Sequence, residues 1–239
     1  MRTNVLGVGF DNLTMAEAVT RAMDTIEARS GRYIVTPNPE IVWLCRKDPA
    51  LGALVSGAEL VLADGVGITL GAKILGRPMK TRIPGIDFAA ALMQEMAQKG
   101  QSVFLYGAKP GIAAQAGDTL QAQYPGLKIA GTADGYGDDA PVREAIHAAA
   151  PDLLLVCLGA PKQETWMNAH GADLNVGLMI GLGGALDVFA GAVKRAPKGW
   201  QKLGLEWLYR LLKEPRRIGR MMRLPLFLLA VVGQRIRGA

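Results

Sequence analysis

The chain has 239 residues, 50% hydrophobic and 20% charged, a composition that predicts a folded core and excludes an intrinsically disordered protein. Two isolated cysteines, Cys45 and Cys157, form neither a disulfide framework nor a zinc spacing, so a reduced, cytoplasmic location is the simplest interpretation. The net charge of +6 is uneven, because residues 194–239 carry twelve Lys or Arg and two acids, a net of +10. Such a basic tail indicates nucleic acid, an anionic membrane or a phosphorylated ligand as partner.

Short apolar runs alternate with helical patterns along residues 1–195. The N-terminal segment has no apolar stretch of signal-peptide length. Thr14 and Glu17 have the spacing of a capping box and predict a helix that runs to about Arg29, and the Asp139–Pro141 segment predicts another helix start. Six runs are predicted as strands: Tyr33–Thr36, Leu60–Ala63, Val103–Tyr106, Lys128–Gly131, Leu153–Leu158 and Val176–Ile180. The alternation predicts an α/β fold, with a parallel or mixed sheet covered by helices.

Residues 196–239 differ from this α/β body and are predicted to form a basic, helical appendage. Apolar residues recur from Trp200 to Leu211 with the spacing of one amphipathic helix. A second helical stretch after Pro215 carries arginines and ends in the apolar run Leu224–Val232, about half of the ~20 residues that a membrane-spanning helix needs. An apolar run of this length between arginines describes a segment lying in a membrane interface. A helical hairpin packed on the body explains the same pattern equally well.

Polar side chains follow two of the predicted strands near the N-terminus. Thr36 and Asn38 come directly after the first strand, where a hydroxyl and an amide can hold a sugar or a phosphate. Asp64 follows the second strand, at the carboxyl end where α/β enzymes place catalytic groups, and Gly65 and Gly67 would let backbone approach a ligand. Helix capping is the alternative for both Asn38 and Asp64.

Two further clusters follow the last two predicted strands. In the first, Pro161 suits the first turn of a helix, and Lys162 and Gln163 stand where a diphosphate or a sugar hydroxyl could be bound. In the second, the run of small residues at 181–185 indicates close packing or a ligand against the backbone. The sequence contains no DxD metal-binding pair, no Ser-His-Asp arrangement and no H-E-x-x-H motif, so no metal site and no cofactor are expected.

In this order the clusters resemble the WecG/TagA/CpsF glycosyltransferase family. The resemblance extends from about Val5 to Arg223. The motifs that carry it are Thr36-x-Asn38, Ala63-Asp64-Gly65-x-Gly67, Arg82-x-x-Gly85-x-Asp87, Gly159-x-Pro161-Lys162-Gln163-Glu164-x-Trp166, Arg195-Ala196-Pro197, and Gly204-Leu205-Glu206-Trp207-Leu208-x-Arg210-Leu211 running on to Arg217. One departure is at Leu186 and Val188, where members of the family more often have aromatic residues flanking the aspartate at position 187.

The resemblance implies a function, a fold and a set of site residues. Members of this family transfer N-acetylmannosamine, its uronic acid or a related hexose from a UDP-sugar to a polyprenyl-diphosphate-linked sugar, in the synthesis of teichoic acid, common antigen or exopolysaccharide. The implied fold is a Rossmann-like sheet with a C-terminal membrane-binding appendage. By the same carry-over, Asp64 is expected to be the general base, and the substrate-binding groups are expected to be Thr36, Asn38, Arg82 and Gln163.

The chemistry of sugar transfer agrees with these assignments. An inverting transfer needs a base for the proton of the acceptor hydroxyl and positive charge for the departing diphosphate. Without a DxD-bound metal, arginines must supply that charge, and the tail offers Arg210, Arg217 and Arg220. We therefore expect a metal-independent enzyme at the cytoplasmic face of the membrane. Whether these arginines contact the diphosphate or only lipid stays open, as does a homo-oligomer.

Three other functions compete with this hypothesis. A non-catalytic module at the membrane surface would explain the tail but leaves Asp64, Arg82 and Gln163 without a role. Nucleic-acid binding is not expected, because the tail arginines are interleaved with apolar residues and lack polar groups suited to reading bases. A nucleotide-sugar epimerase would need a nicotinamide site, and the glycines at positions 65, 67 and 71 do not have the required spacing.

Overall fold

The chain opens with a β-hairpin that the sequence patterns did not predict. The structure is a computed structural model that describes residues 2–213, 219 and 223–237. Strands β1 (Arg2–Val5) and β2 (Val8–Asp11) pair antiparallel around a two-residue turn, in which Leu6 and Gly7 both have positive φ. The carboxylate of Asp11 accepts hydrogen bonds from Arg2 Nε (3.1 Å) and from the backbone N–H of Val61 (2.9 Å). Asp11 therefore ties the hairpin to the main sheet.

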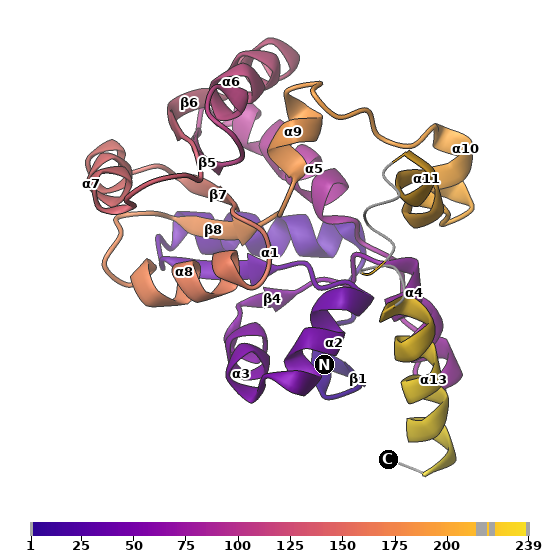
Figure 1. Ribbon diagram of the computed structural model, residues 1–239. Helices are drawn as coiled ribbons and strands as arrows, with labels where there is room; N and C mark the ends of the chain where they lie inside the picture. Colours follow the sequence, from indigo (N-terminus) through magenta and orange to yellow (C-terminus); the bar gives the residue numbers. More distant parts are fainter. Residues whose placement is uncertain (1, 214–218, 220–222, 238–239) are drawn as a thin grey trace.

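A parallel, six-stranded sheet forms the centre of the molecule (Figure 1) and confirms the predicted α/β fold. Its order is β4-β3-β8-β7-β5-β6, which differs from the order 3-2-1-4-5-6 of the classic dinucleotide-binding fold. Each of the six strands overlaps one of the predicted apolar runs, with bounds that differ by up to two residues: β3 (Arg32–Val35), β4 (Leu60–Val61), β5 (Ser102–Gly107), β6 (Lys128–Ala133), β7 (Leu153–Cys157) and β8 (Leu178–Gly181). Buried side chains fill nearly all of the strands except the edge strand β6.

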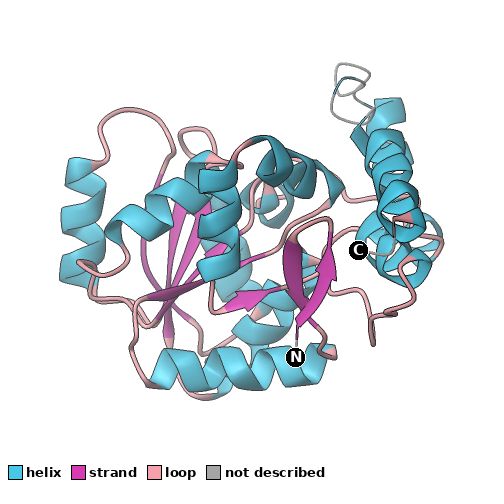
Figure 2. Cartoon of the chain, turned by 90° about the horizontal axis from the view of Figure 1, so that it is seen from below, coloured by secondary structure: helices cyan, strands magenta, loops and turns pink. Residues whose placement is uncertain are grey.

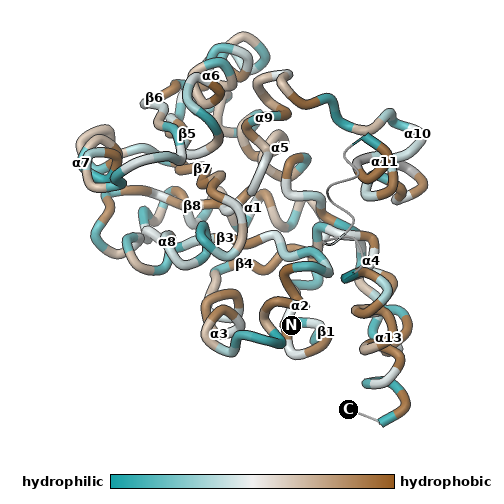
Figure 3. Tube along the Cα trace, viewed as in Figure 1, coloured by the Kyte–Doolittle hydropathy of each residue, from teal (hydrophilic) through white to brown (hydrophobic). Residues whose placement is uncertain are grey.

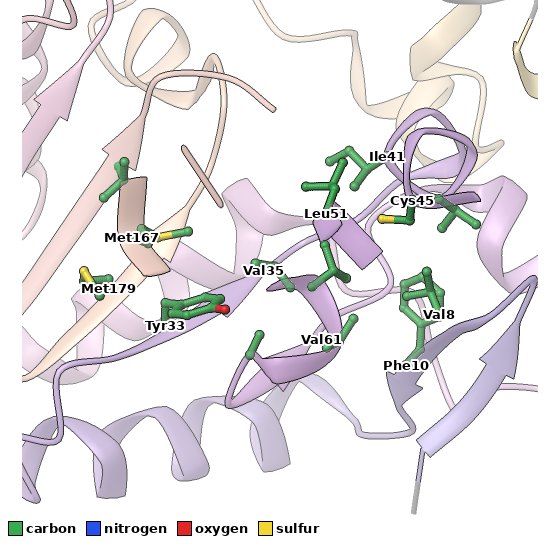
Figure 4. Close-up of a cluster of buried hydrophobic side chains, with 14 of the residues drawn as sticks. Val8, Phe10, Tyr33, Val35, Ile41, Cys45, Leu51, Val61, Met167 and Met179 are labelled. Atoms are coloured by element: carbon green, nitrogen blue, oxygen red, sulfur yellow. The ribbon is translucent and has the colours of Figure 1, made fainter. Parts of the chain in front are cut away.

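Helices cover both faces of the sheet (Figure 2), and each face has its own apolar core. One face is covered by α2 (Pro39–Lys47), α3 (Pro49–Gly57), α7 (Ala140–Ala149) and α8 (Lys162–His170). Figure 4 shows side chains of β2, β3, β4, α2, α3 and α8 meeting in this first core. The other face is covered by α1 (Met15–Glu27), α5 (Gly85–Gln98), α6 (Ile112–Gln123) and α9 (Ala185–Phe189). The capping box predicted at Thr14 is present at the start of α1.

The change of face between neighbouring strands decides where a ligand can bind. The helices that follow β3 pack on the first face, whereas α9, which follows the adjacent β8, packs on the second. Connections that leave two neighbouring strands in opposite directions open a crevice beyond their carboxyl ends. In this sheet the crevice lies beside Thr36, which directly follows β3.

The tail contains three described helices, α10 (Lys198–Lys202), α11 (Glu206–Lys213) and α13 (Arg223–Ile236). The prediction of one amphipathic helix over residues 200–211 is wrong, because Gly204 has a φ of 70° and separates α10 from α11. The last helix, α13, packs on α2 and on α4 (Val66–Ile74). Its Phe227 and Val231 are fully buried and belong to the first core. A Cβ at Gly71 of α4 would lie 3.3 Å from both side chains, so this glycine lets α13 approach closely.

The outer face of α13 is apolar and exposed. Leu229 is 69% exposed and Ile236 is 80% exposed, and Leu226 and Val232 continue the same stripe. Figure 3 shows this hydrophobic helix lying beside α4, at the periphery of the molecule. Among the described residues, no helix is both long enough and apolar enough to span a bilayer. The helix thus buries one apolar side in the protein and presents a second one to the surroundings.

We predict that Phe227→Ala releases α13 from the body. Truncating a fully buried phenylalanine costs about 3–5 kcal/mol, and here the loss falls on the contact between α13 and α4. Trypsin should cleave the tail much faster in the variant, while circular dichroism still reports a folded sheet. The matched control is Leu229→Ala, which removes an exposed leucine from the same helix and should leave the cleavage rate unchanged. Equal cleavage rates in wild type and Phe227→Ala would contradict the docking of α13.

Candidate active site

A cavity of about 260 Å³ lies at the carboxyl ends of β4, β3 and β8, where the crevice opens. Its walls come from widely separated parts of the sequence, including five of the six family motifs given above. The polar side chains that line it are Thr36, Asn38, Glu40, Asp64, Arg82, Arg195 and Glu206. The structure therefore brings together Asp64 and three of the predicted substrate-binding residues.

Asp64 leaves the end of β4 and is partly exposed in the cavity. Its Oδ1 accepts a hydrogen bond from the backbone N–H of Gly85 (3.3 Å), the first residue of α5. The alternative of a cap for the following helix does not hold, because the N-cap of α4 is Gly65 and no side chain caps that helix. A carboxylate that is held by a backbone amide and partly exposed in a cavity can accept a proton from a bound hydroxyl group.

The glycines after Asp64 line the cavity and also allow close packing within the protein. A Cβ at Gly65 would lie 2.7 Å from the ring of Pro39. A Cβ at Gly67 would lie 2.6 Å from the same proline and 2.8 Å from Leu224 of α13. Both glycines therefore allow α4 to lie tightly against α2, and Gly67 also against the tail.

Thr36 and Asn38 both line the cavity, and each also has a structural hydrogen bond. The hydroxyl of Thr36 donates to the carbonyl oxygen of Gly181 at the end of β8 (3.3 Å). The Oδ1 of Asn38 accepts from the N–H of Ile41 (3.1 Å) and caps α2, so the capping alternative for Asn38 is confirmed. The Nδ2 group of Asn38 is not used by this cap, and it can donate to a ligand oxygen in the same cavity.

A network of ion pairs joins three separate motifs at one side of the cavity. Glu206 of α11 accepts from Arg82 Nη2 (3.2 Å) and from Arg195 Nε (3.0 Å). Arg195 also donates from both terminal nitrogens to the carboxylate of Asp87 on α5. This bidentate contact with Asp87, together with Glu206, raises the pKa of Arg195 above its ordinary value. The sequence predicts Arg82 as a substrate-binding residue but not these ion pairs, because spacing does not show which acid meets which arginine.

Gln163 does not line the cavity, although it was expected to bind substrate. It is 3% exposed at the start of α8, where its Oε1 accepts from the N–H of Gly183 (2.9 Å). Its Nε2 donates to Glu164 (2.9 Å). Gln163 therefore contacts the loop that follows β8, and that loop lines the cavity at Leu182 and Gly184.

The tail completes the wall of the cavity. Gly204, Glu206 and Trp207 line it from α11 and the preceding turn, and Leu224 lines it from α13. Arg223 is fixed beside this wall by an ion pair with Glu40 of α2 (3.0 Å). Of the three tail arginines expected at the site, Arg210 is placed on α11 by its backbone only, and Arg217 and Arg220 lie outside the described residues.

No group of three or more His, Cys, Asp or Glu side chains that could hold a metal ion is found in the described part of the chain. Asp87 and Glu206 both contact Arg195, so its guanidinium group occupies the position between the two carboxylates. The cavity thus contains fixed positive charge from two arginines and negative charge from several carboxylates.

Comparison with known proteins gives the cavity a biochemical context. Residues 3–239 match the model described as "Glycosyl transferase WecG/TagA/CpsF family". A relative from Bacillus spizizenii is 38% identical over 208 residues, which cover 87% of this chain and 81% of the relative. A relative from Staphylococcus aureus is 37% identical over 231 residues, or 95% of this chain and 91% of the relative. Both are named N-acetylglucosaminyldiphosphoundecaprenol N-acetyl-beta-D-mannosaminyltransferase.

Proposed function

This chain belongs to the WecG/TagA/CpsF family of glycosyltransferases, and we propose that it transfers N-acetylmannosamine or a related hexose from a UDP-sugar to a GlcNAc unit on a polyprenyl diphosphate. The observation that carries the proposal is the cavity at the ends of β4, β3 and β8, where Asp64 is held at one wall and the tail forms another. The names of relatives that align along almost the whole chain support the choice of sugar and acceptor.

The proposed reaction uses Asp64 as the base. Asp64 accepts the proton of the acceptor hydroxyl while that oxygen forms a bond to the anomeric carbon of the donor sugar. The bond from the anomeric carbon to the UDP oxygen breaks at the opposite side, and UDP leaves with the electron pair. A single displacement of this kind inverts the anomeric configuration. The Gly85 N–H helps to fix the direction of the carboxylate before the substrate arrives.

Arginines are proposed to stabilise the departing UDP. Arg82 is 23% exposed at the cavity and is joined to Glu206 by a single contact, so other donors of its guanidinium can reach a phosphate. A role for the tail is also supported by Trp207 and Leu224, which both line the cavity. We propose that Arg210, Arg217 and Arg220 provide further positive charge for the diphosphate.

The membrane is proposed to be the place of reaction. The acceptor is anchored in lipid, and the outer stripe of α13 presents Leu226, Leu229 and Ile236 to the surroundings. Arg235 and Arg237 lie at the end of the same helix, and basic residues beside an apolar stripe suit an anionic bilayer surface. We propose peripheral attachment at the cytoplasmic face, with α13 bound to the body on one side and to lipid on the other.

We predict that transfer does not require a divalent metal. Arginine forks can neutralise the diphosphate directly, and the sequence has no DxD pair to hold an ion. Activity should therefore survive excess EDTA within a factor of about two or three. A loss of activity in EDTA that is restored by titrating Mg²⁺ or Mn²⁺ would contradict this part of the proposal.

A donor screen tests the proposed reaction. The purified protein is mixed with a polyprenyl-diphosphate-GlcNAc analogue and with UDP-ManNAc, UDP-GlcNAc, UDP-glucose or UDP-galactose in turn, and released UDP is measured. Acceptor-dependent release of UDP is expected, and it should be fastest with UDP-ManNAc. No acceptor-dependent release with any donor, together with binding to liposomes, would instead favour a non-catalytic module at the membrane surface.

A further inference from the structure

Glu164 is a buried acid that the active site does not explain. It is 1% exposed in the first turn of α8 and does not line the cavity. Its Oε2 is buried without a hydrogen-bond partner among the described residues. Burial raises the pKa of this carboxyl above its ordinary value. A buried acid with an unsatisfied oxygen is costly to keep, so its position calls for a reason.

The hydrogen bonds of Glu164 fix the direction of a neighbouring amide. The N–H of Gly183 can only donate, so the oxygen of the Gln163 side chain must face it, at 2.9 Å. The amide nitrogen of Gln163 then points to Glu164 Oε1, at 2.9 Å, and this oxygen has to accept. If the side-chain amide of Gln163 were rotated by 180°, its Nε2 group would face the N–H of Gly183, donor against donor, and its hydrogen bond to Glu164 would be lost.

The amide of Gln163 in turn supports one wall of the cavity. Gly183 lies between Leu182 and Gly184, which both line the cavity. A Cβ at Gly181 would lie 2.9 Å from Gln163 Nε2, so the side chain packs directly on the end of β8. The carbonyl oxygen of Gly181 accepts a hydrogen bond from the hydroxyl of Thr36, which also lines the cavity.

The same contacts continue to the proposed base. A Cβ at Gly85 would lie 2.9 Å from the hydroxyl oxygen of Thr36 and 3.0 Å from the side chain of Leu182. Gly85 is also the residue whose N–H donates to Asp64. An unbroken set of packed groups therefore runs from Glu164 to the catalytic carboxylate, through the loop at residues 181–184 and Thr36.

We propose that Glu164 is a positioning residue, which accepts from Gln163 and thereby holds the Gly183 loop and Thr36 in the geometry needed for sugar transfer. The inference rests on the proposed function, since it assigns Glu164 a part in the same site. This role requires an acceptor oxygen at position 164 and not a negative charge, because Gln163 Nε2 needs only a hydrogen-bond acceptor.

Two substitutions separate the acceptor from the side-chain volume. Glu164→Gln keeps an oxygen for Gln163 Nε2, whereas Glu164→Met has a similar length and no comparable acceptor. We expect Glu164→Gln to keep kcat/KM within about three-fold of wild type and Glu164→Met to lose at least ten-fold. Hydrogen exchange at the Gly183 amide gives a second readout without substrate: it should accelerate about ten-fold in Glu164→Met and stay near wild type in Glu164→Gln.

Cys45→Ala is the matched control. Cys45 is buried in the first core, where burial, and to a smaller extent the charge of Glu164, raises the pKa of its thiol to about 11. The alanine should lower the melting temperature while transfer and Gly183 exchange stay unchanged. If Glu164→Met does not fold, Glu164→Asp takes its place in the test. The aspartate side chain is one methylene shorter, so its carboxyl loses the same contact with Gln163 Nε2.

Two outcomes would overturn the positioning role. One is that Glu164→Met transfers sugar and exchanges the Gly183 amide at wild-type rates; the other is that Glu164→Gln and Glu164→Met lose kcat/KM equally. A wild-type protein without transfer on any donor would overturn the proposed function instead. The exchange comparison at Gly183 would still test the role of Glu164 in that case.

Discussion

Asp64→Asn is expected to lower turnover by about 10²–10⁴-fold, the range typical for loss of a general base. The asparagine can still accept the hydrogen bond from the Gly85 N–H, so the fold and the affinity for UDP should change little. Because the amide cannot take the proton of the acceptor hydroxyl, the loss should appear in kcat rather than in donor binding. Initial rates and calorimetric titration with UDP measure the two effects separately.

Asp118→Asn is the matched control for this experiment. Asp118 is exposed on α6, and the same change of charge there should leave turnover and melting temperature as in wild type. Normal turnover in Asp64→Asn would place the base elsewhere. A melting temperature far below that of wild type would assign Asp64 a structural role.

Single changes of Arg210, Arg217 and Arg220 to alanine are expected to lower turnover on a water-soluble acceptor analogue by roughly 10²–10³-fold each. This is the size of effect found when one preorganised donor to a developing oxyanion is removed. Each variant loses only one basic residue, worth about 1 kcal/mol at an anionic surface, so liposome binding should weaken only moderately. Kinetics on the soluble acceptor and liposome pelleting therefore distinguish chemistry from anchoring.

Arg21→Ala provides the comparison, because Arg21 is an exposed arginine on α1. It should leave turnover unchanged. Full activity of all three tail variants on the soluble acceptor would show that their charge serves the membrane alone. Truncation near Arg195 is a less clean test than these point changes, since it would also remove Phe227 and Val231 from the first core and uncover α2 and α4.

The strands of the main sheet could be predicted because a parallel sheet buried on both faces needs continuous apolar runs. The segments at Tyr33, Leu105 and Leu154 show this pattern and lie in buried strands. The N-terminal hairpin was missed because its strands have four residues each, and its turn at Leu6 and Gly7 lacks the usual Asn-Gly or Asp-Gly signal. The break at Gly204 was missed because a glycine inside a helical pattern does not by itself reveal a positive φ.

The site was predictable in part for a similar reason. Asp64 and Thr36 follow strands, and the carboxyl ends of neighbouring parallel strands necessarily converge. Gln163 also follows a strand, but its side chain turns inward to Gly183 and Glu164, which depends on packing that spacing does not encode. The partners of Arg82 and Arg195 were likewise not predictable, because Glu206 arrives from the tail.

The anomeric configuration of the product tests the proposed reaction most directly. Wild-type protein is incubated with UDP-ManNAc, whose sugar is α-linked, and with the polyprenyl-diphosphate-GlcNAc analogue, and the new glycosidic linkage is determined by NMR. Direct displacement assisted by Asp64 predicts a β-linked ManNAc on the GlcNAc unit, formed by wild type and nearly absent with Asp64→Asn. An α-linked product, or a β-linked product formed equally fast by Asp64→Asn, would contradict the account.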